Sequence, residues 1–127
     1  MPLIQVDLDK GLFDSVHEPL SKAIHQAQID ALDIPADDLF QLFYPHATDE
    51  VKFDPGYNGV DRQNLVVVRI TMVRGYSLGT KRRLYRAIVA RLGECGVRAE
   101  DILISVVENG SDDWYAGRAR EIGPQEE

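Results

Sequence analysis

Apolar residues gather in four stretches of the chain, and these stretches predict β-strands. They cover residues 2–8, 39–44, 65–73 and 102–107, and each ends close to a glycine, a proline or a charged residue. The stretch over 65–73 is apolar at nearly every position, which is typical of a strand in the centre of a sheet. A further short strand is expected over 51–53.

Two segments between these strands have apolar residues at the three-to-four-residue spacing of an amphipathic helix. The first helix is expected over 15–32, because Ser15 and Glu18 have the spacing of a capping box. Pro19 would then fall in the first turn, where its missing N–H does little harm. The second helix is expected over 78–93.

The order strand, helix, strand occurs twice, and the two halves resemble each other at a constant offset of 63 residues. Residues 2–8 align with 65–71, and residues 36–39 align with 99–102. An offset shared by several elements indicates an internal repeat. The repeat divides one domain, residues 1–127, into half-repeats over about 2–45 and 64–109 and a C-terminal tail over 110–127.

This pattern predicts an α+β fold, an α/β repeat built from two right-handed β-α-β units. The compact arrangement is one four-stranded mixed sheet with both helices on one face. The strands within a unit run parallel, and a pseudo-twofold relation pairs the first strands of the two units antiparallel at the centre. Because the strands are apolar on both sides, the open face of the sheet is expected to be apolar and to form an oligomer.

Composition narrows the class of protein. The net charge of −7 argues against general nucleic-acid binding. No apolar run approaches the length of a membrane span, and the N-terminus lacks the basic and apolar regions of a signal peptide. A single cysteine, Cys95, excludes an internal disulfide and a cysteine-based zinc site. A cytoplasmic protein is therefore expected.

The chain places a proline at the first position of its first strand, where the missing N–H is tolerated. If the initiator Met1 is removed, Pro2 offers a rigid secondary amine that can act as general base, general acid or nucleophile towards carbonyl compounds. An α-amino group titrates near pH ~8, close enough to neutrality for its surroundings to tune it. Taken alone, however, a Met-Pro start is common and more often has no function.

The expected topology brings two more charged residues to the end of the sheet where Pro2 lies. Asp38 precedes a strand parallel to the first, and Arg74 follows a strand antiparallel to it. An arginine can hold a carboxylate in a two-pronged hydrogen bond, and a carboxylate beside an amine can stabilise its charged form. Taken alone, Asp38 is more commonly explained as a solvated turn residue, as Asp101 at the matching position without an N-terminal partner suggests. Arg74 alone could be a surface charge, so the hypothesis depends on the convergence.

Several segments together resemble the tautomerase superfamily, and most closely its malonate semialdehyde decarboxylase-like members. The resemblance covers roughly residues 2–120 and lies in the order and spacing of its motifs, which are Met1-Pro2-Leu3-Ile4, Ile34-Pro35-Ala36-Asp37-Asp38-Leu39-Phe40-Gln41, the strand that ends near Arg74, Glu108-Asn109 and Asp113-Trp114. It implies a homotrimer of β-α-β repeats, removal of the initiator methionine, catalysis by the N-terminal proline, and no metal or organic cofactor.

The resemblance also implies roles for individual residues. Pro2 matches the catalytic amine, Asp38 the aspartate that assists it, and Arg74 the arginine that binds the substrate carboxylate. Trp114 matches an aromatic residue of the pocket wall, and Tyr76 and Tyr115 complete the candidate binding set. His25 matches a family histidine, but its place on a helix beside an isoleucine favours a structural or supporting role.

Two departures from the decarboxylase pattern affect the expected reaction. The decarboxylases have a Trp-x-Phe pattern where this chain has Trp114-Tyr115-Ala116. They also have a second arginine shortly after the first, where this chain has Gly75-Tyr76. Both changes argue against decarboxylase specificity but leave the proline chemistry in place. The missing second arginine favours keto–enol tautomerisation of a small, phenylpyruvate-like oxo acid, with neutral Pro2 moving the proton.

Two alternatives stay open. One is cofactor-independent decarboxylation or hydration of a 3-oxo acid such as malonate semialdehyde, with cationic Pro2 polarising the carbonyl. The other, of a different class, is a non-catalytic trimeric module that binds an anion or a protein partner.

Overall fold

The computed structural model describes residues 2–124, so the expected removal of Met1 lies outside the described residues. The strands and helices are β1 (Leu3–Asp9), α1 (Lys10–Leu32), β2 (Gln41–His46), β3 (Val66–Val73), α2 (Leu78–Glu94) and β4 (Ile102–Asn109). Short 3₁₀ turns occur at Thr48–Glu50, Tyr57–Gly59, Ala99–Asp101, Ser111–Asp113 and Ala119–Ile122.

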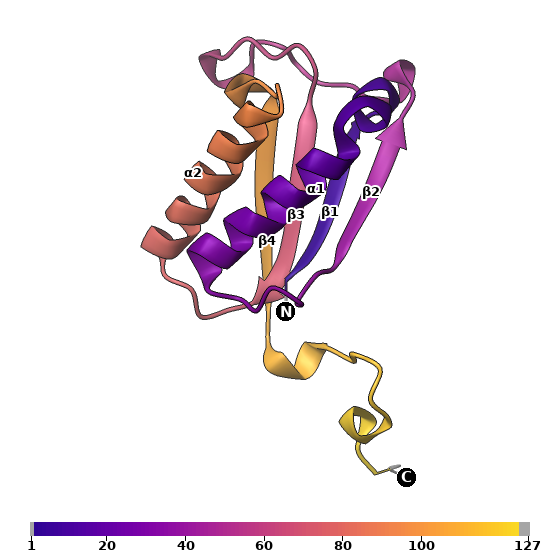
Figure 1. Cartoon of the computed structure of the whole chain (residues 1–127), viewed down its shortest axis with the longest axis vertical. Helices are drawn as coiled ribbons and strands as arrows, with labels where there is room; N and C mark the ends of the chain where they lie inside the picture. Colours follow the sequence, from indigo (N-terminus) through magenta and orange to yellow (C-terminus); the bar gives the residue numbers. More distant parts are fainter. Residues whose placement is uncertain (1, 125–127) are drawn as a thin grey trace.

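The four strands of the described chain form one mixed sheet in the order β2-β1-β3-β4. β1 pairs antiparallel with β3 at the centre, and each outer strand runs parallel to its inner neighbour. Both helices cover one face of the sheet, and the chain after β4 leaves the body as an extended tail (Figure 1). The β-α-β repeat, the mixed sheet and the central position of the 65–73 strand are therefore confirmed.

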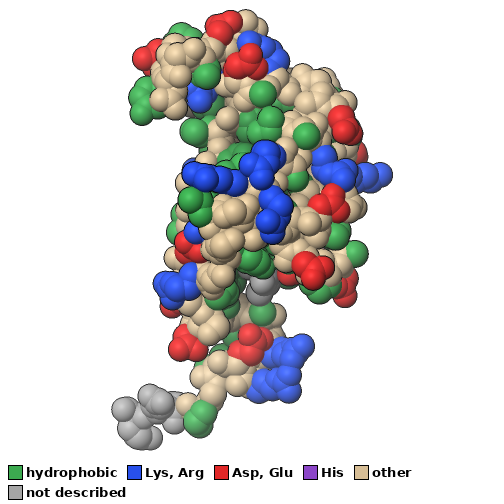
Figure 2. Space-filling view, turned by 90° about the vertical axis from the view of Figure 1, so that its left-hand side faces the viewer, with side chains coloured by type: hydrophobic (Ala, Val, Ile, Leu, Met, Phe, Trp, Pro, Cys, Tyr) green, Lys and Arg blue, Asp and Glu red, His purple; other side chains and the backbone are tan. Residues whose placement is uncertain are grey.

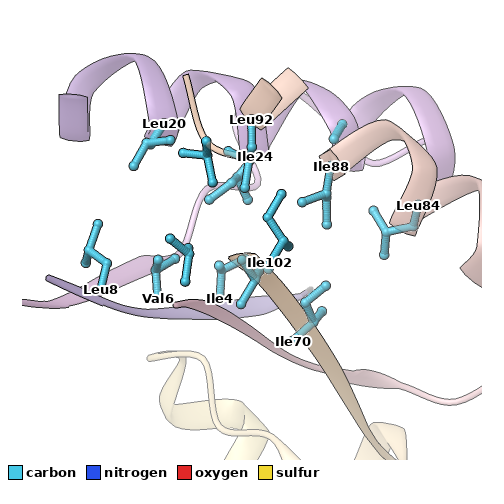
Figure 3. Close-up of a cluster of buried hydrophobic side chains, with 14 of the residues drawn as sticks. Ile4, Val6, Leu8, Leu20, Ile24, Ile70, Leu84, Ile88, Leu92 and Ile102 are labelled. Carbon is cyan, nitrogen blue, oxygen red and sulfur yellow. The ribbon is translucent and has the colours of Figure 1, made fainter. Parts of the chain in front are cut away.

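The hydrophobic core lies between the helices and the sheet. Alternate residues of β1 and β3 point towards the helices, as the two-residue period of a strand requires, and meet one stripe of each helix (Figure 3). Shortening one of these side chains to alanine typically costs about 2–5 kcal/mol of stability. Fully buried members are Ile4, Val6, Leu20, Ile24, Ala27, Val66, Val68, Ile70, Leu84, Ile88 and Leu92.

Helix α1 begins five residues earlier than expected, directly after β1. The Asp9 carboxylate accepts a hydrogen bond from the N–H of Gly11 (2.9 Å) and caps the helix. The expected capping residue, Ser15, lies inside the helix and donates to the carbonyl of Gly11 (3.0 Å). Pro19 therefore lies in the helix interior, not in the first turn.

Two expectations about the strands were wrong. β2 is displaced towards the C-terminus and includes Pro45, which is tolerated because β2 is an edge strand with one side unpaired. Residues 51–53 form no strand and lie between two short 3₁₀ turns of the long connection before β3.

The open face of the sheet is mixed, whereas a wholly apolar face was expected. Apolar side chains on the outer strands are about half exposed, namely Leu42 (48%), Leu103 (46%) and Val107 (49%). Between them runs a polar group joined by hydrogen bonds and an ion pair. Its contacts are Asp7–His46 (2.7 Å), Gln5–Tyr44 (3.3 Å) and Asp7–Arg69 (3.9 Å). Neither α1 nor α2 is long and apolar enough to cross a membrane.

Candidate active site

Pro2 lies at the end of the sheet where β3 finishes. It is buried and immediately precedes β1. Leu3 pairs with Thr71, so extending the antiparallel register by one residue places Pro2 across from Met72. Arg74 follows only two residues later. In Figure 1 the N-terminus, the end of β3 and the loop before β2 meet at this end of the molecule.

Asp38 approaches the same end from the opposite side of β1. The N–H of Ile4 donates to the carbonyl of Phe40 (2.9 Å), so the segment before β2 runs beside the first residues of β1. The N–H of Asp38 donates to the carbonyl of Pro35 (3.0 Å), which fixes the turn that carries this half-buried carboxylate. The structure thus brings Asp38, Pro2 and Arg74 to one rim of the sheet.

His25 supports this loop. Its Nε2 lies 2.7 Å from the carbonyl oxygen of Ala36, two residues before Asp38. Since a carbonyl can only accept, Nε2 carries the proton and donates it. Nδ1 is buried without a hydrogen-bond partner within the described residues. The contact ties α1 to the Asp38 turn, which fits a supporting role.

Arg74 is held through its main chain and packs against the loop after β4. Its N–H donates to the carbonyl of Asn109 (2.8 Å). Its exposed guanidinium lies against Gly110, where a Cβ would come within 3.2 Å of Nη1. A side chain at position 110 would therefore press on the guanidinium.

A tight turn at the start of the tail fixes Trp114. The indole N–H donates to the side-chain oxygen of Asn109 (2.8 Å). The N–H of Gly110 donates to the Asp113 carboxylate (2.7 Å), and the N–H of Asp113 donates back to the carbonyl of Gly110 (3.1 Å). The sequence interpretation gave Asn109, Gly110 and Asp113 no role, although Asn-Gly-Ser-Asp after a strand is a clear turn signal.

The two candidate tyrosines lie in different surroundings. Tyr76 is half-buried and packs against the hydrophobic core. Tyr115 lies on the tail and is 59% exposed. The tail that carries it stands out from the body of the molecule in the side view (Figure 2).

Asp101 is the structural counterpart of Asp38 in the second half-repeat. Its side chain is nearly buried and accepts hydrogen bonds from the N–H of Gln63 (2.8 Å) and from the Arg98 guanidinium (3.4 Å). Gln63 lies just before the segment that aligns with Pro2. In the second half-repeat the carboxylate at this position therefore binds a main-chain N–H. In the first half-repeat its counterpart, Asp38, lies beside the beginning of β1.

Another ion pair lies near this end. Lys81, in the first turns of α2, forms a 2.7 Å ion pair with Glu108 near the end of β4. Two groups with shifted pKa values lie elsewhere. The Gln26 hydrogen bond and then Arg91 lower the pKa of Asp30, while burial and then the Glu94 charge raise the pKa of the Cys95 thiol. Within residues 2–124, His, Cys, Asp and Glu side chains form no group of three arranged for a metal.

Comparison with known proteins gives consistent matches. A family model described as tautomerase enzyme matches residues 38–117. Probable tautomerase YusQ of Bacillus subtilis (strain 168) is 34% identical over 94% of this chain and 96% of its own length. The solved FG41 malonate semialdehyde decarboxylase inhibited by 3-bromopropiolate is 28% identical, with a TM-score of 0.86 over 94% of each chain. A second malonate semialdehyde decarboxylase is 30% identical, with a TM-score of 0.84 over 94% of this chain and 93% of that one.

The chain therefore belongs to the tautomerase superfamily. Its similarity to the two decarboxylases places it in the malonate semialdehyde decarboxylase-like branch. As a member it is an enzyme, an isomerase or a carboxy-lyase, which disfavours a non-catalytic binding module.

Proposed function

We propose that this protein interconverts the keto and enol forms of a small, phenylpyruvate-like oxo acid, with Pro2 as the proton carrier once Met1 has been removed. The observation that carries the proposal is the convergence of Pro2, Asp38 and Arg74 at one rim of the sheet. A neutral Pro2 nitrogen takes a proton from the enol oxygen or from the carbon beside the carbonyl, and returns it to the other atom. As the proton moves, the double bond shifts between the carbon–carbon and carbon–oxygen positions, and no other bond is broken.

Arg74 binds the substrate carboxylate, because a guanidinium is always charged and matches a carboxylate through two parallel hydrogen bonds. Asp38 assists Pro2, because a nearby carboxylate stabilises the protonated amine. Trp114 forms a wall of the pocket, held in place by Asn109. Tyr76 and Tyr115 belong to the proposed binding set as the residues that follow Arg74 and Trp114 in the chain.

We also propose a cytoplasmic homotrimer that joins through the open sheet face and has neither nucleic-acid nor membrane partners. The half-exposed Leu42, Leu103 and Val107 supply apolar area for such an interface. The polar group around Asp7 fits an interface that keeps some water. The net charge of −7 disfavours nucleic acid.

A second candidate is decarboxylation or hydration of a 3-oxo acid such as malonate semialdehyde. It is supported by the similarity over 94% of the chain to two malonate semialdehyde decarboxylases, one of them described by its decarboxylase and hydratase activities. In decarboxylation a cationic Pro2 polarises the 3-carbonyl, the bond to the carboxylate carbon breaks, and carbon dioxide leaves. The electron pair stays on the enolate, which is then protonated.

The test compares wild-type protein with Pro2→Ala, using Pro55→Ala in the long connection before β3 as a control at an exposed proline. Intact mass first establishes that Met1 is absent, because a retained methionine would cover the amine. The proposal expects phenylpyruvate isomerisation, followed by ultraviolet absorbance, in the wild type and in Pro55→Ala, and its loss in Pro2→Ala. Equal isomerisation rates in all three proteins would rule out Pro2 as the proton carrier. Carbon dioxide release from malonate semialdehyde without phenylpyruvate isomerisation would favour the second candidate.

A further inference from the structure

A carboxylate that the proposed mechanism does not use lies beside Arg74. A Cβ built on Gly110 would be 3.2 Å from Nη1 of Arg74 and 3.3 Å from Oδ2 of Asp113. The Arg74 guanidinium and the Asp113 carboxylate, which carry opposite charges, thus both lie close to Gly110. Gly110 leaves the space between them open, because it has no side chain.

The position of the Asp113 carboxylate is fixed by the turn that starts the tail. It accepts the N–H of Gly110 (2.7 Å), and its own N–H donates to the carbonyl of Gly110 (3.1 Å). Arg74 is fixed relative to the same loop by its hydrogen bond to the carbonyl of Asn109 (2.8 Å). Arg74 and Asp113 are therefore both hydrogen-bonded to the same short stretch of main chain, Asn109 and Gly110.

The charges at this rim determine how many negative charges a ligand can bring. The Arg74 guanidinium can accept one carboxylate. Asp38 lies on the far side of β1, and Lys81, a cation in the first turns of α2, is engaged with Glu108. A second carboxylate on the ligand would meet negative charge from Asp38 and Asp113, and like charges at short range repel.

We infer that Asp113 is a specificity-determining residue that favours oxo acids with one carboxylate over those with two. The inference rests on the proposed function, because it takes Arg74 as the carboxylate-binding group. The Asp113 charge leaves monoanion binding possible and raises the dissociation constant of a dianion. Since Arg74 and Asp113 are both exposed to solvent, the effect is limited by screening.

The experiment compares Asp113→Asn with Asp112→Asn, a neutralisation of the neighbouring carboxylate in the same 3₁₀ turn. Asparagine keeps an oxygen that can accept the Gly110 N–H, so the turn is retained. The ligands are 2-oxopentanoate and 2-oxoglutarate, which have the same five-carbon length and differ by one carboxylate. Binding is followed by the fluorescence of Trp114, which is the single tryptophan of the chain.

The expected result is that the ratio of the 2-oxoglutarate to the 2-oxopentanoate dissociation constant falls about three- to tenfold in Asp113→Asn, as a screened charge at short range predicts. Asp112→Asn keeps the wild-type ratio. An unchanged ratio in Asp113→Asn, or an equal fall in both variants, overturns the inference.

Binding and turnover separate this inference from the proposed function. If the binding ratio shifts as expected while Pro2→Ala isomerises phenylpyruvate as fast as wild type, the proposed reaction fails and the role of Asp113 stands. If Pro2→Ala is inactive and the ratio does not shift, the reaction stands and the role of Asp113 fails. Wild-type protein that binds neither acid contradicts both.

Discussion

The side-chain oxygen of Asn109 accepts a hydrogen bond from the indole nitrogen of Trp114 at 2.8 Å. The carbonyl of the same asparagine accepts the main-chain N–H of Arg74, also at 2.8 Å. One residue at the end of β4 thus joins the proposed carboxylate-binding arginine to the proposed aromatic wall. A change to the Asn109 side chain is expected to release Trp114, whereas the hydrogen bond to Arg74, which uses the main chain, should remain.

Asn109→Ala should weaken substrate binding more than turnover. Removing the side-chain oxygen releases the indole but leaves the carbonyl that holds Arg74. Loss of one hydrogen bond of about 0.5–1.5 kcal/mol corresponds to a rise in KM of about two- to tenfold, with kcat changed less. Trp114 emission should shift to longer wavelength as the indole becomes more exposed. Asn109→Asp keeps the acceptor and should restore the wild-type emission; a variant Asn109→Ala with unshifted emission would show that the bond does not hold the ring.

Gly110→Ala should disturb Arg74 although alanine suits the local backbone, whose φ is −100°. The new methyl group would lie 3.2 Å from Nη1 and 3.3 Å from the Asp113 carboxylate, closer than an ordinary contact. We expect KM for a monocarboxylate oxo acid to rise several-fold.

Gly93→Ala is the matched control for this change. In α2 its Cβ meets nothing within 4 Å outside the backbone of its own helix. It should raise stability by at most about 0.5 kcal/mol, because Gly93 lies in the last turn of α2 and glycine costs its full amount only in a helix interior, and leave KM unchanged. Equal KM values for the two variants would contradict the proposed packing at Arg74.

Asp38 and Asp101 occupy matching positions, but substituting Asp101 should lower stability, whereas substituting Asp38 should lower activity. Asp101→Ala removes the acceptor for the N–H of Gln63 and leaves that group unpaired, at a cost of about 1–3 kcal/mol in the free energy of unfolding. Asp38→Ala should instead lower kcat/KM by about 100-fold or more, as the loss of a group that assists proton transfer typically does. Urea denaturation and phenylpyruvate assays on both variants check the contrast. A loss of activity in folded Asp101→Ala equal to that in Asp38→Ala would refute it.

Cys95 should react slowly with alkylating agents at neutral pH. Burial, and then the charge of Glu94, raise the pKa of its thiol. A raised pKa means a smaller thiolate fraction at a given pH, and the thiolate is the reactive form. Iodoacetamide modification followed by mass spectrometry should be slower for the folded protein than for the same protein in urea. It should accelerate only at a pH above that at which the unfolded thiol reacts.

The fold could be predicted from the sequence where the same pattern of strand, helix and strand occurs twice. The offset of 63 residues predicted the two β-α-β units, and the pairing of β1 with β3 follows it. The sequence prediction was wrong where a single side chain determines the residue at which a helix begins. The capping-box spacing at Ser15 suggested a helix start, but Asp9 caps the helix earlier because its carboxylate reaches the N–H of Gly11.

The candidate site was predicted only as far as topology determines it. Pro2, Asp38 and Arg74 could be placed at one rim because strand directions alone bring them there. The Asn109–Trp114 bond and the position of Asp113 depend on how a four-residue turn closes, which spacing cannot specify. The polar group around Asp7 was missed because its members come from three strands and pair only across the sheet.

The tail that begins at Gly110 separates two tasks in this molecule. The proposed reactive amine, that of Pro2, immediately precedes β1, whose Ile4 and Val6 lie in the core, so changes there risk unfolding the protein. The tail residues that we propose to face a ligand are mostly exposed and contribute little to the core. Under the proposed function, mutations in a short terminal segment would therefore change the substrate and leave the proposed proline chemistry unaltered.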